Sequence, residues 1–193
     1  TKDYSPFRNN GTVHGANWNA TGGYDGFGAY EFDPSDYIEI SDSPSLNSPT
    51  TTRAVTFAFW IKENTWNFSY EWNYLILKEL SASERDYLIT FRNSTKKISL
   101  SLGNGSSWEH TYCSKTDWKP DTWYFITVTY NDTTKISKYY VNGEFINSDS
   151  FSLPNLLIDT NAALKVKARN GTLDNVMIFD RELSSEEIYA LYK

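Results

Sequence analysis

The last part of the chain constrains the fold more than any other stretch. Residues 171–179 form a short apolar run that Asp174 interrupts, which is typical of a half-buried or fully buried strand. Ser184 lies three residues before Glu187, the spacing of a helix capping box, and Ile188 follows it. We therefore expect a strand, a turn and a short helix. An acidic side chain beside core residues needs a hydrogen bond, a cation or a metal, so Asp174 requires a partner.

The rest of the chain is typical of an all-β protein. Polar and apolar residues alternate over residues 29–33 and 37–40, and residues 55–62 and 123–130 form strong strand segments. Asn142-Gly143 is the strongest two-residue hairpin signal, because both central positions of a type I′ turn need positive φ. Few segments have a helical pattern. These features predict a sandwich of roughly a dozen strands.

Length, charge and cysteine content narrow the class further. A chain of 193 residues without a repeat or linker fits a single domain over residues 1–193. The net charge of −6 and the lack of a basic run argue against nucleic acid as a partner. No apolar stretch approaches a membrane span, so no membrane insertion is expected. Cys113 is the only cysteine, which excludes an internal disulfide.

Five segments follow one another along the chain in a characteristic order: SDSPSL at 41–46, VTFAFWIK at 55–62, YVNGE at 140–144, GTLDNV at 171–176 and LSSEEI at 183–188. In this order they resemble the laminin G-like form of the concanavalin A-like lectin/glucanase superfamily. The resemblance implies an antiparallel two-sheet jelly-roll sandwich with a short C-terminal helix. The chain departs from the family pattern at residues 33–36, where Pro34 replaces the usual glycine and the turn is one residue shorter.

The resemblance also implies a structural calcium ion. The Asp of the last-strand motif is Asp174, and backbone carbonyls from the N-terminal loop and from the turn that contains Asp33 and Asp36 would complete the site. Calcium suits such a site because it accepts carboxylate and carbonyl oxygens in irregular geometry. The alternative is that Asp174 is hydrogen-bonded to loop amides or paired with a cation such as Arg181. The change at Pro34 disturbs a turn that carries ligands in the family.

Aromatic residues in or beside loops are candidates for carbohydrate binding, because aromatic rings stack on the apolar face of a sugar. These candidates are Trp66, Tyr70, Trp72, Trp108, His110 and Tyr112. The alternative is that many of them cap the edges of the sandwich. Trp18, Trp60 and Trp123 lie in strand-like segments and are expected in the core.

The sequence lacks the pattern of a catalytic site. Glucanases of the superfamily place paired carboxylates on one strand, in E-x-D-x-E or E-x-D-x-x-E spacing, and this chain has no such segment. His14 and His110 have no catalytic or metal-binding motif around them. A glycoside hydrolase or lyase is therefore the third and weakest interpretation.

Glycosylation triplets are moderately abundant for a chain so rich in Asn, Ser and Thr. The seven triplets begin at Asn10, Asn19, Asn67, Asn93, Asn104, Asn131 and Asn170. They favour an extracellular or cell-surface location, although composition alone explains part of the excess.

Together these features predict a non-catalytic extracellular recognition module, carbohydrate-binding (lectin-like) or adhesive, whose partner is a carbohydrate or a surface glycoprotein. The abrupt start at Thr1 suggests a part of a larger chain. The alternative is a protein-binding or structural domain of a larger cell-surface protein.

The missing carboxylate pair leads to a first prediction. Purified protein should release no new reducing ends from β-glucans, because no strand presents an acid and a base to one cleft. A reducing-sugar assay on fractions from the last purification step tests this. Activity that follows the protein peak would contradict the prediction.

Overall fold

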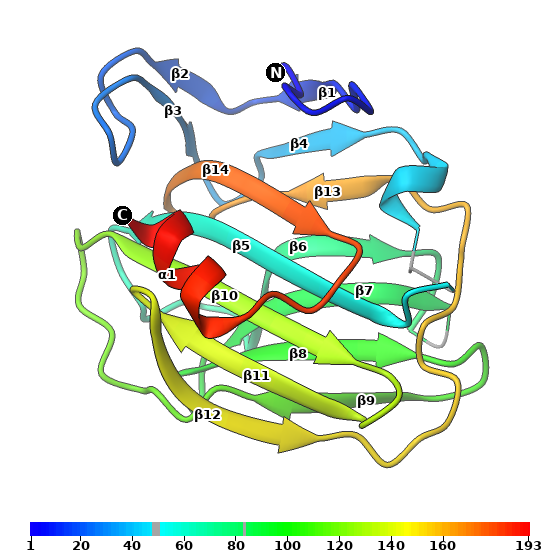
Figure 1. Cartoon of the computed structure of the whole chain (residues 1–193). Coiled ribbons are helices and arrows are strands. Elements are labelled where there is room, and N and C mark those ends of the chain that lie inside the picture. The colour runs from blue at the N-terminus through cyan, green and yellow to red at the C-terminus, as the bar shows by residue number, and fades with distance from the viewer. Residues whose placement is uncertain (48–50, 83) are drawn as a thin grey trace.

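The computed structural model describes residues 1–47, 51–82 and 84–193, and it confirms the all-β jelly-roll prediction. Two seven-stranded antiparallel sheets pack face to face, and one short helix covers part of the outer face of one sheet (Figure 1). Within the described ranges, no helix is long and apolar enough to span a membrane.

We name the two sheets I and II and give their strands in spatial order. Sheet I consists of β1 (Gly11–His14), β4 (Tyr37–Ile40), β13 (Leu164–Val166), β6 (Trp72–Glu79), β7 (Arg85–Arg92), β8 (Lys97–Gly103) and β9 (Trp108–Tyr112). Sheet II consists of β12 (Glu144–Ser150), β11 (Ile136–Val141), β10 (Tyr124–Asn131), β5 (Ala54–Glu63), β14 (Gly171–Phe179), β3 (Ala29–Phe32) and β2 (Asn17–Asn19). A 3-10 turn, η1 (Pro44–Leu46), and the helix α1 (Ser185–Tyr192) complete the fold.

The core lies between the inner faces of the two sheets. Phe57, Phe59 and Ile61 of β5 are fully buried there, as the alternation of that strand requires. Tyr139 of β11 also points inward, and its hydroxyl binds across the interface. It accepts a hydrogen bond from the Leu100 N–H at 3.0 Å and lies 2.8 Å from the Thr111 hydroxyl. These bonds satisfy a buried hydroxyl and link sheet II to sheet I.

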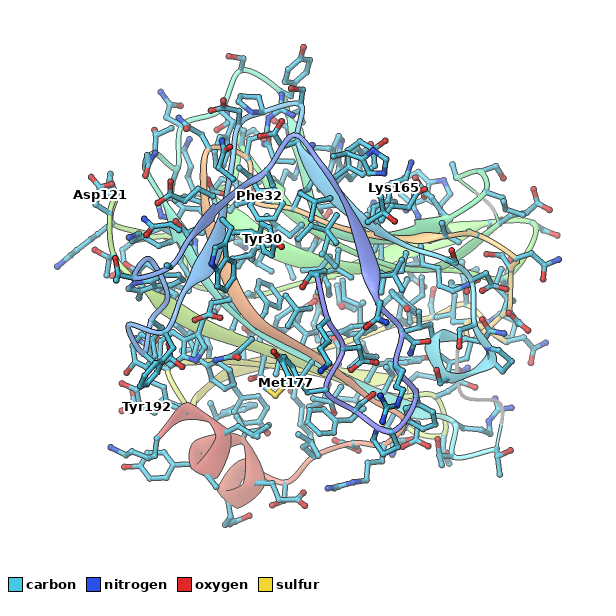
Figure 2. All side chains as sticks on the ribbon, turned by 90° about the horizontal axis from the view of Figure 1, so that it is seen from above. Tyr30, Phe32, Asp121, Lys165, Met177 and Tyr192 are labelled. Atoms are coloured by element: carbon cyan, nitrogen blue, oxygen red, sulfur yellow. The ribbon has the colours of Figure 1, made fainter. Side chains whose placement is uncertain are left out.

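The turn and cap signals in the sequence have the expected local geometry. Asn142 and Gly143 have φ of 54° and 77°, as a type I′ hairpin between β11 and β12 requires. Ser184 and Glu187 form a reciprocal capping box at the start of α1. The helix packs on the outer face of sheet II, where Met177 and Tyr192 both border one apolar cluster. In Figure 2 both residues lie on the side of the molecule away from Lys165.

A buried charge network holds the long connection between β12 and β13. The fully buried Lys78 ammonium lies 2.8 Å from the Asp86 carboxylate and 2.9 Å from that of Asp42, and it donates to the Thr160 carbonyl at 2.7 Å. Asp86 in turn accepts the Thr160 N–H at 2.7 Å. Since breaking one partner of a buried pair leaves an uncompensated charge, this network fixes the connection to sheet I.

A second buried carboxylate lies where the chain crosses from sheet I to sheet II. Glu63, at the end of β5, is fully buried and accepts the backbone N–H groups of Arg169 and Asn170 at 2.7 and 2.8 Å. Burial raises the pKa of Glu63 to about 7, while those two N–H groups and the charges of Arg169 and Lys167 act in the opposite direction. Glu63 therefore anchors the crossing between β13 and β14.

The raised pKa of Glu63 predicts a pH-dependent stability. A carboxyl whose pKa rises on folding stabilises the folded state below its unfolded pKa, and this contribution is lost as the pH rises through 7. Relative to Glu63→Gln, the parent should lose up to about 3 kcal/mol of unfolding free energy between pH 4.5 and pH 8. Urea unfolding of both proteins across this range measures the difference.

The control for this prediction is Glu144→Gln, a substitution at an exposed position of β12. Its stability should follow the parent at every pH. Parallel pH profiles for the parent and Glu63→Gln would contradict the prediction.

Candidate binding site

Aromatic side chains gather on the outer face of sheet I, where five of the six predicted ligand-binding residues lie. We name this surface the aromatic face. It consists of Tyr70, Trp72, Tyr74, Trp108, His110 and Tyr112. Tyr70 is 62% exposed and Trp108 is 45% exposed, so both rings are open to a ligand. Tyr74 was not predicted, because it lies in an ordinary strand segment.

The centre of the aromatic face is a stack of two rings from strands that are not neighbours. Trp72 of β6 and His110 of β9 lie parallel, with ring centroids 4.8 Å apart, although β7 and β8 separate their strands. Between them, Thr90 and Ser99 are paired residues on the outward side of β7 and β8, and both are fully buried. Small side chains at these positions leave room for flat rings to cover the sheet. Trp108 packs edge-on against His110 at 4.6 Å.

Two ion-paired arginines flank the rings. Arg92 lies over Trp72 at 5.0 Å, and its Nε donates to Glu71 at 2.7 Å. Arg85 lies over Trp108 at 5.6 Å, and its Nε donates to Glu79 at 2.6 Å. Cation–π contact and ion pairing together hold both guanidinium groups beside the rings. The Arg92 side chain is 35% exposed and can offer planar donors to a hydroxylated ligand, whereas the Arg85 side chain is 8% exposed and supports the ring of Trp108.

His110 acts as an uncharged ring in this arrangement. Burial, together with the charges of Arg85 and Arg92, lowers its pKa to about 4, although Glu109 acts in the opposite direction. The imidazole is therefore neutral at every pH above about 5. A neutral ring can stack on Trp72 and on a ligand without the cost of desolvating a charge.

A hollow of about 590 Å³ adjoins the rings at the start of β6. Tyr70, Trp72 and Tyr74 line it together with Glu71 and Arg169. The Arg169 guanidinium lies 4.6 Å from the centre of the Tyr70 ring and donates to the Pro34 carbonyl at 2.9 Å. The volume falls within the range of small-molecule sites. The hollow and the ring stack share Trp72, so one extended ligand can contact both.

Two tryptophans lie elsewhere than the sequence predicted. Trp66 is only 5% exposed, because its ring packs in the core against Phe91 and Trp118, and it is therefore not part of the aromatic face. Trp18 is 57% exposed on the edge strand β2, which corrects its expected place in the core. Trp60 is buried under Tyr24, but on the outer face of sheet II.

Asp174 has its partners in the N-terminal loop. Its Oδ2 accepts the Tyr24 N–H at 3.0 Å. A Cβ at Gly23 would lie 2.8 Å from this oxygen, 2.8 Å from the Gly28 carbonyl and 3.0 Å from Asp25 Oδ1. Three oxygens thus surround one small space, a donor set of the kind that calcium accepts. Burial raises the pKa of Asp174, and the nearby Asp25 charge adds to this effect.

The other two predicted metal ligands lie away from Asp174. Gly171 pairs with Phe32 of β3, so the turn at Asp33 meets the start of β14, whereas Asp174 lies further along and faces the loop of Tyr24. Asp36 accepts the Asp33 N–H at 2.8 Å. Among the described residues, no group of three acidic, histidine or cysteine side chains is arranged for a metal. Asp25, which has no motif around it, is the carboxylate that lies near Asp174, and the sequence analysis did not include it.

The glycosylation triplets differ in how free their side chains are. The amide nitrogens of Asn19, Asn93, Asn104 and Asn131 each donate a hydrogen bond to another residue. In the described part of the chain, those of Asn10, Asn67 and Asn170 donate none. Of these, Asn10 and Asn67 are exposed, so they are the most accessible acceptors.

Comparisons with known proteins agree with the architecture. A family model described as the concanavalin A-like lectin/glucanases superfamily matches residues 32–189. No curated protein matches the sequence. Similar solved structures include botulinum neurotoxin type C, whose cell entry is described as dependent upon interaction with two ganglioside molecules, with TM-score 0.78 and 16% identity over 99% of this chain and 47% of the toxin chain.

Two further toxin structures resemble the chain to a similar degree. The serotype G binding domain has TM-score 0.77 and 17% identity over 99% of this chain and 47% of its own. The binding domain of botulinum neurotoxin DC, in complex with rat synaptotagmin II, has TM-score 0.77 and 16% identity over 99% and 48%. The chain spans about half the length of these neighbours. The likeness therefore shows their fold and does not locate ganglioside or synaptotagmin on the matched half.

The oxygens around Gly23 generate a prediction about calcium. An ion that binds only the folded state should add about 2.7 kcal/mol at a hundredfold excess over its dissociation constant. The melting temperature should then rise by roughly 5–10 °C for a domain of this size. Asp174→Asn should lower the melting temperature and abolish the calcium response, and Asp25→Asn should weaken it. Calorimetry on metal-stripped protein, in calcium and in chelator, measures both effects.

The matched control is Asp33→Asn, which should keep the full calcium response, because Asp33 lies away from the Tyr24 loop. Identical melting curves of the stripped parent in calcium and in chelator would rule out the metal. They would leave Asp174 as an acceptor for the Tyr24 amide.

Proposed function

This chain belongs to the concanavalin A-like lectin/glucanase superfamily, and from that premise we propose that it is a non-catalytic carbohydrate-binding module. The binding site is the aromatic face of sheet I. The ligand is a glycan that stacks on the rings and extends into the hollow beside Tyr70. The domain acts outside the cell or at its surface, as part of a larger chain, and binds free carbohydrate or a surface glycoprotein.

The observation that carries this proposal is the ring stack of Trp72 and His110, extended by Trp108 and flanked by two arginines. The apolar face of a sugar stacks on a flat apolar surface, and the hydroxyl groups of the sugar bind donors or acceptors around that surface. Here the rings provide the surface and Arg92 provides donors, while the buried Arg85 supports the Trp108 ring. Ion pairs hold both arginines in place before a ligand arrives, which reduces the entropy lost on binding.

The carboxylates near the rings favour binding over catalysis. Glycoside hydrolysis needs one carboxyl group that is protonated at working pH. Glu71 is hydrogen-bonded to Ser94 and paired with Arg92, and both contacts lower its pKa. Glu63 has a raised pKa, but it is fully buried and both its oxygens accept backbone N–H groups. Neither can act as a general acid toward a ligand on the aromatic face.

The alternative function is protein binding or a structural role, in which the rings would be scattered or buried. Trp66 is buried, as that alternative requires. Trp72 and Trp108, however, both contact the ring of His110 and form one surface. This joint surface favours a glycan as the ligand.

The surface location and the calcium ion belong to the same proposal. Asn10 and Asn67 are exposed acceptors for N-linked glycans, which attach in the secretory pathway. Calcium at Asp174 and Asp25 would fix the N-terminal loop to sheet II. Its role is structural, because the loop lies on the sheet opposite the aromatic face.

Truncation of one exposed ring tests the site. Trp108→Ala should weaken glycan binding about tenfold or more, because the loss of a stacking contact of about 1.4 kcal/mol has that effect. Trp18→Ala is the matched control, since Trp18 is similarly exposed but lies on sheet II. A glycan array identifies the ligand, and calorimetry with the best hit measures the affinities.

Two results would contradict the proposal. One is an array on which the folded parent binds no glycan, which would favour the protein-binding alternative. The other is equal loss of affinity in both tryptophan variants.

A further inference from the structure

A second hollow lies on the other side of the sandwich, at one end of the outer face of sheet II. It encloses about 270 Å³. Thr172 of β14 forms its floor and pairs with Glu31 of β3 on one side and with Lys62 of β5 on the other. Asp33 and Asp121 also line it, and in Figure 2 Asp121 lies on the side of Phe32 away from Lys165. We name this site the polar hollow.

The charged groups of the polar hollow lack ionic partners. In the part of the chain that the structure describes, Glu31, Asp33, Lys62 and Asp121 form no ion pair. Lys62 lies over the Trp123 ring, 5.1 Å from its centre, and Glu31 accepts an amide hydrogen from Asn19 at 2.7 Å. Three carboxylates therefore face one ammonium, which leaves the hollow negative.

This contrasts with the aromatic face, where Glu71 and Glu79 are each paired with an arginine. A concave site lined by charges of one sign attracts ligands of the opposite sign. The polar hollow is thus suited to a ligand that carries a positive charge.

The other lining groups indicate what else the ligand carries. Asn64 and Asn170 place two side-chain amides at the hollow, and the only contact between those amides is a long hydrogen bond of 3.4 Å. Both amides can therefore turn toward a ligand and bind hydroxyl groups. The acidic groups do not form a cluster arranged for a metal among the described residues, so a bare cation is a poor match. The small volume limits the ligand to about one sugar ring.

We propose that the polar hollow binds a single amino-sugar unit with a free amine. Its ammonium group lies among the carboxylates of Glu31, Asp33 and Asp121. Its hydroxyl groups bind the amides of Asn64 and Asn170. This site is separate from the aromatic face and does not require that face to bind a glycan.

The test is a titration of the isotope-labelled parent with glucosamine, followed by NMR at constant ionic strength and at a pH that keeps the amine protonated. The side-chain amide signals of Asn64 and Asn170 should shift and saturate. Glucose and N-acetylglucosamine, which lack the charged amine, should bind at least tenfold more weakly. The double substitution Asp33→Asn with Asp121→Asn should weaken glucosamine binding at least tenfold.

The substitution at position 121 is compatible with the backbone, since Asp121 has φ of 53° and asparagine tolerates that conformation. Glu144→Gln, at an exposed position of β12, is the control and should leave glucosamine binding unchanged. Loss of array binding in Trp108→Ala, with glucosamine binding intact, would show the two sites to be independent.

Four outcomes would overturn the inference. In the first, glucose shifts the amide signals of Asn64 and Asn170 as much as glucosamine does, and in the second, ethanolamine binds as tightly as glucosamine. In the third, calcium alone causes the same shifts, and in the fourth, the double variant binds glucosamine as tightly as the parent. Ethanolamine carries a charged amine with a single hydroxyl, so equal affinity would reduce the hollow to a site for any amine, such as a lysine side chain of a protein.

Discussion

The buried carboxylate of Glu63 fixes the last passage of the chain from sheet I to sheet II. Its two oxygens accept the backbone N–H groups of Arg169 and Asn170, which lie between β13 of sheet I and β14 of sheet II. Because an unpaired backbone N–H in the core is costly, these two hydrogen bonds hold this crossing in place. The crossing in turn places Arg169 beside Tyr70 and Asn170 in the polar hollow.

The outer faces of the two sheets differ in whether their carboxylates are paired with a cation. On the aromatic face, arginine and glutamate neutralise each other beside stacked rings, and His110 is kept neutral by burial. In the polar hollow, the carboxylates remain without a cation among the described side chains, apart from the single lysine at its edge. One surface is therefore suited to ring stacking and the other to an electrostatic contact.

Much of the fold could be predicted from the sequence, because alternation and turn chemistry act locally. The strands at residues 55–62 and 123–130, the hairpin at Asn142 and the capping box at Ser184 all depend on residues close in sequence. The burial of side chains in the loops was harder to predict. Trp66 and Trp72 lie in one polar segment, yet one ring is in the core and the other on the surface, since such a segment has no period that separates them.

The sites depended on contacts that no local pattern encodes. Asp174 accepts the Tyr24 amide, 150 residues away in the chain, with Asp25 nearby, and no local pattern in the sequence indicates these neighbours. The aromatic residues of the binding face were found by their type and loop position. Arg85 and Arg92 were not predicted. They lie at the two ends of β7, and the buried centre of that strand does not indicate that its end residues contact the aromatic face.

The two hollows share two stretches of backbone. Residues 169 and 170 are consecutive, as are residues 33 and 34, and in each pair one residue lines the hollow of the aromatic face and the other lines the polar hollow. An insertion in either turn would therefore reshape both hollows at once. The two surfaces cannot vary independently of each other at this end of the sandwich.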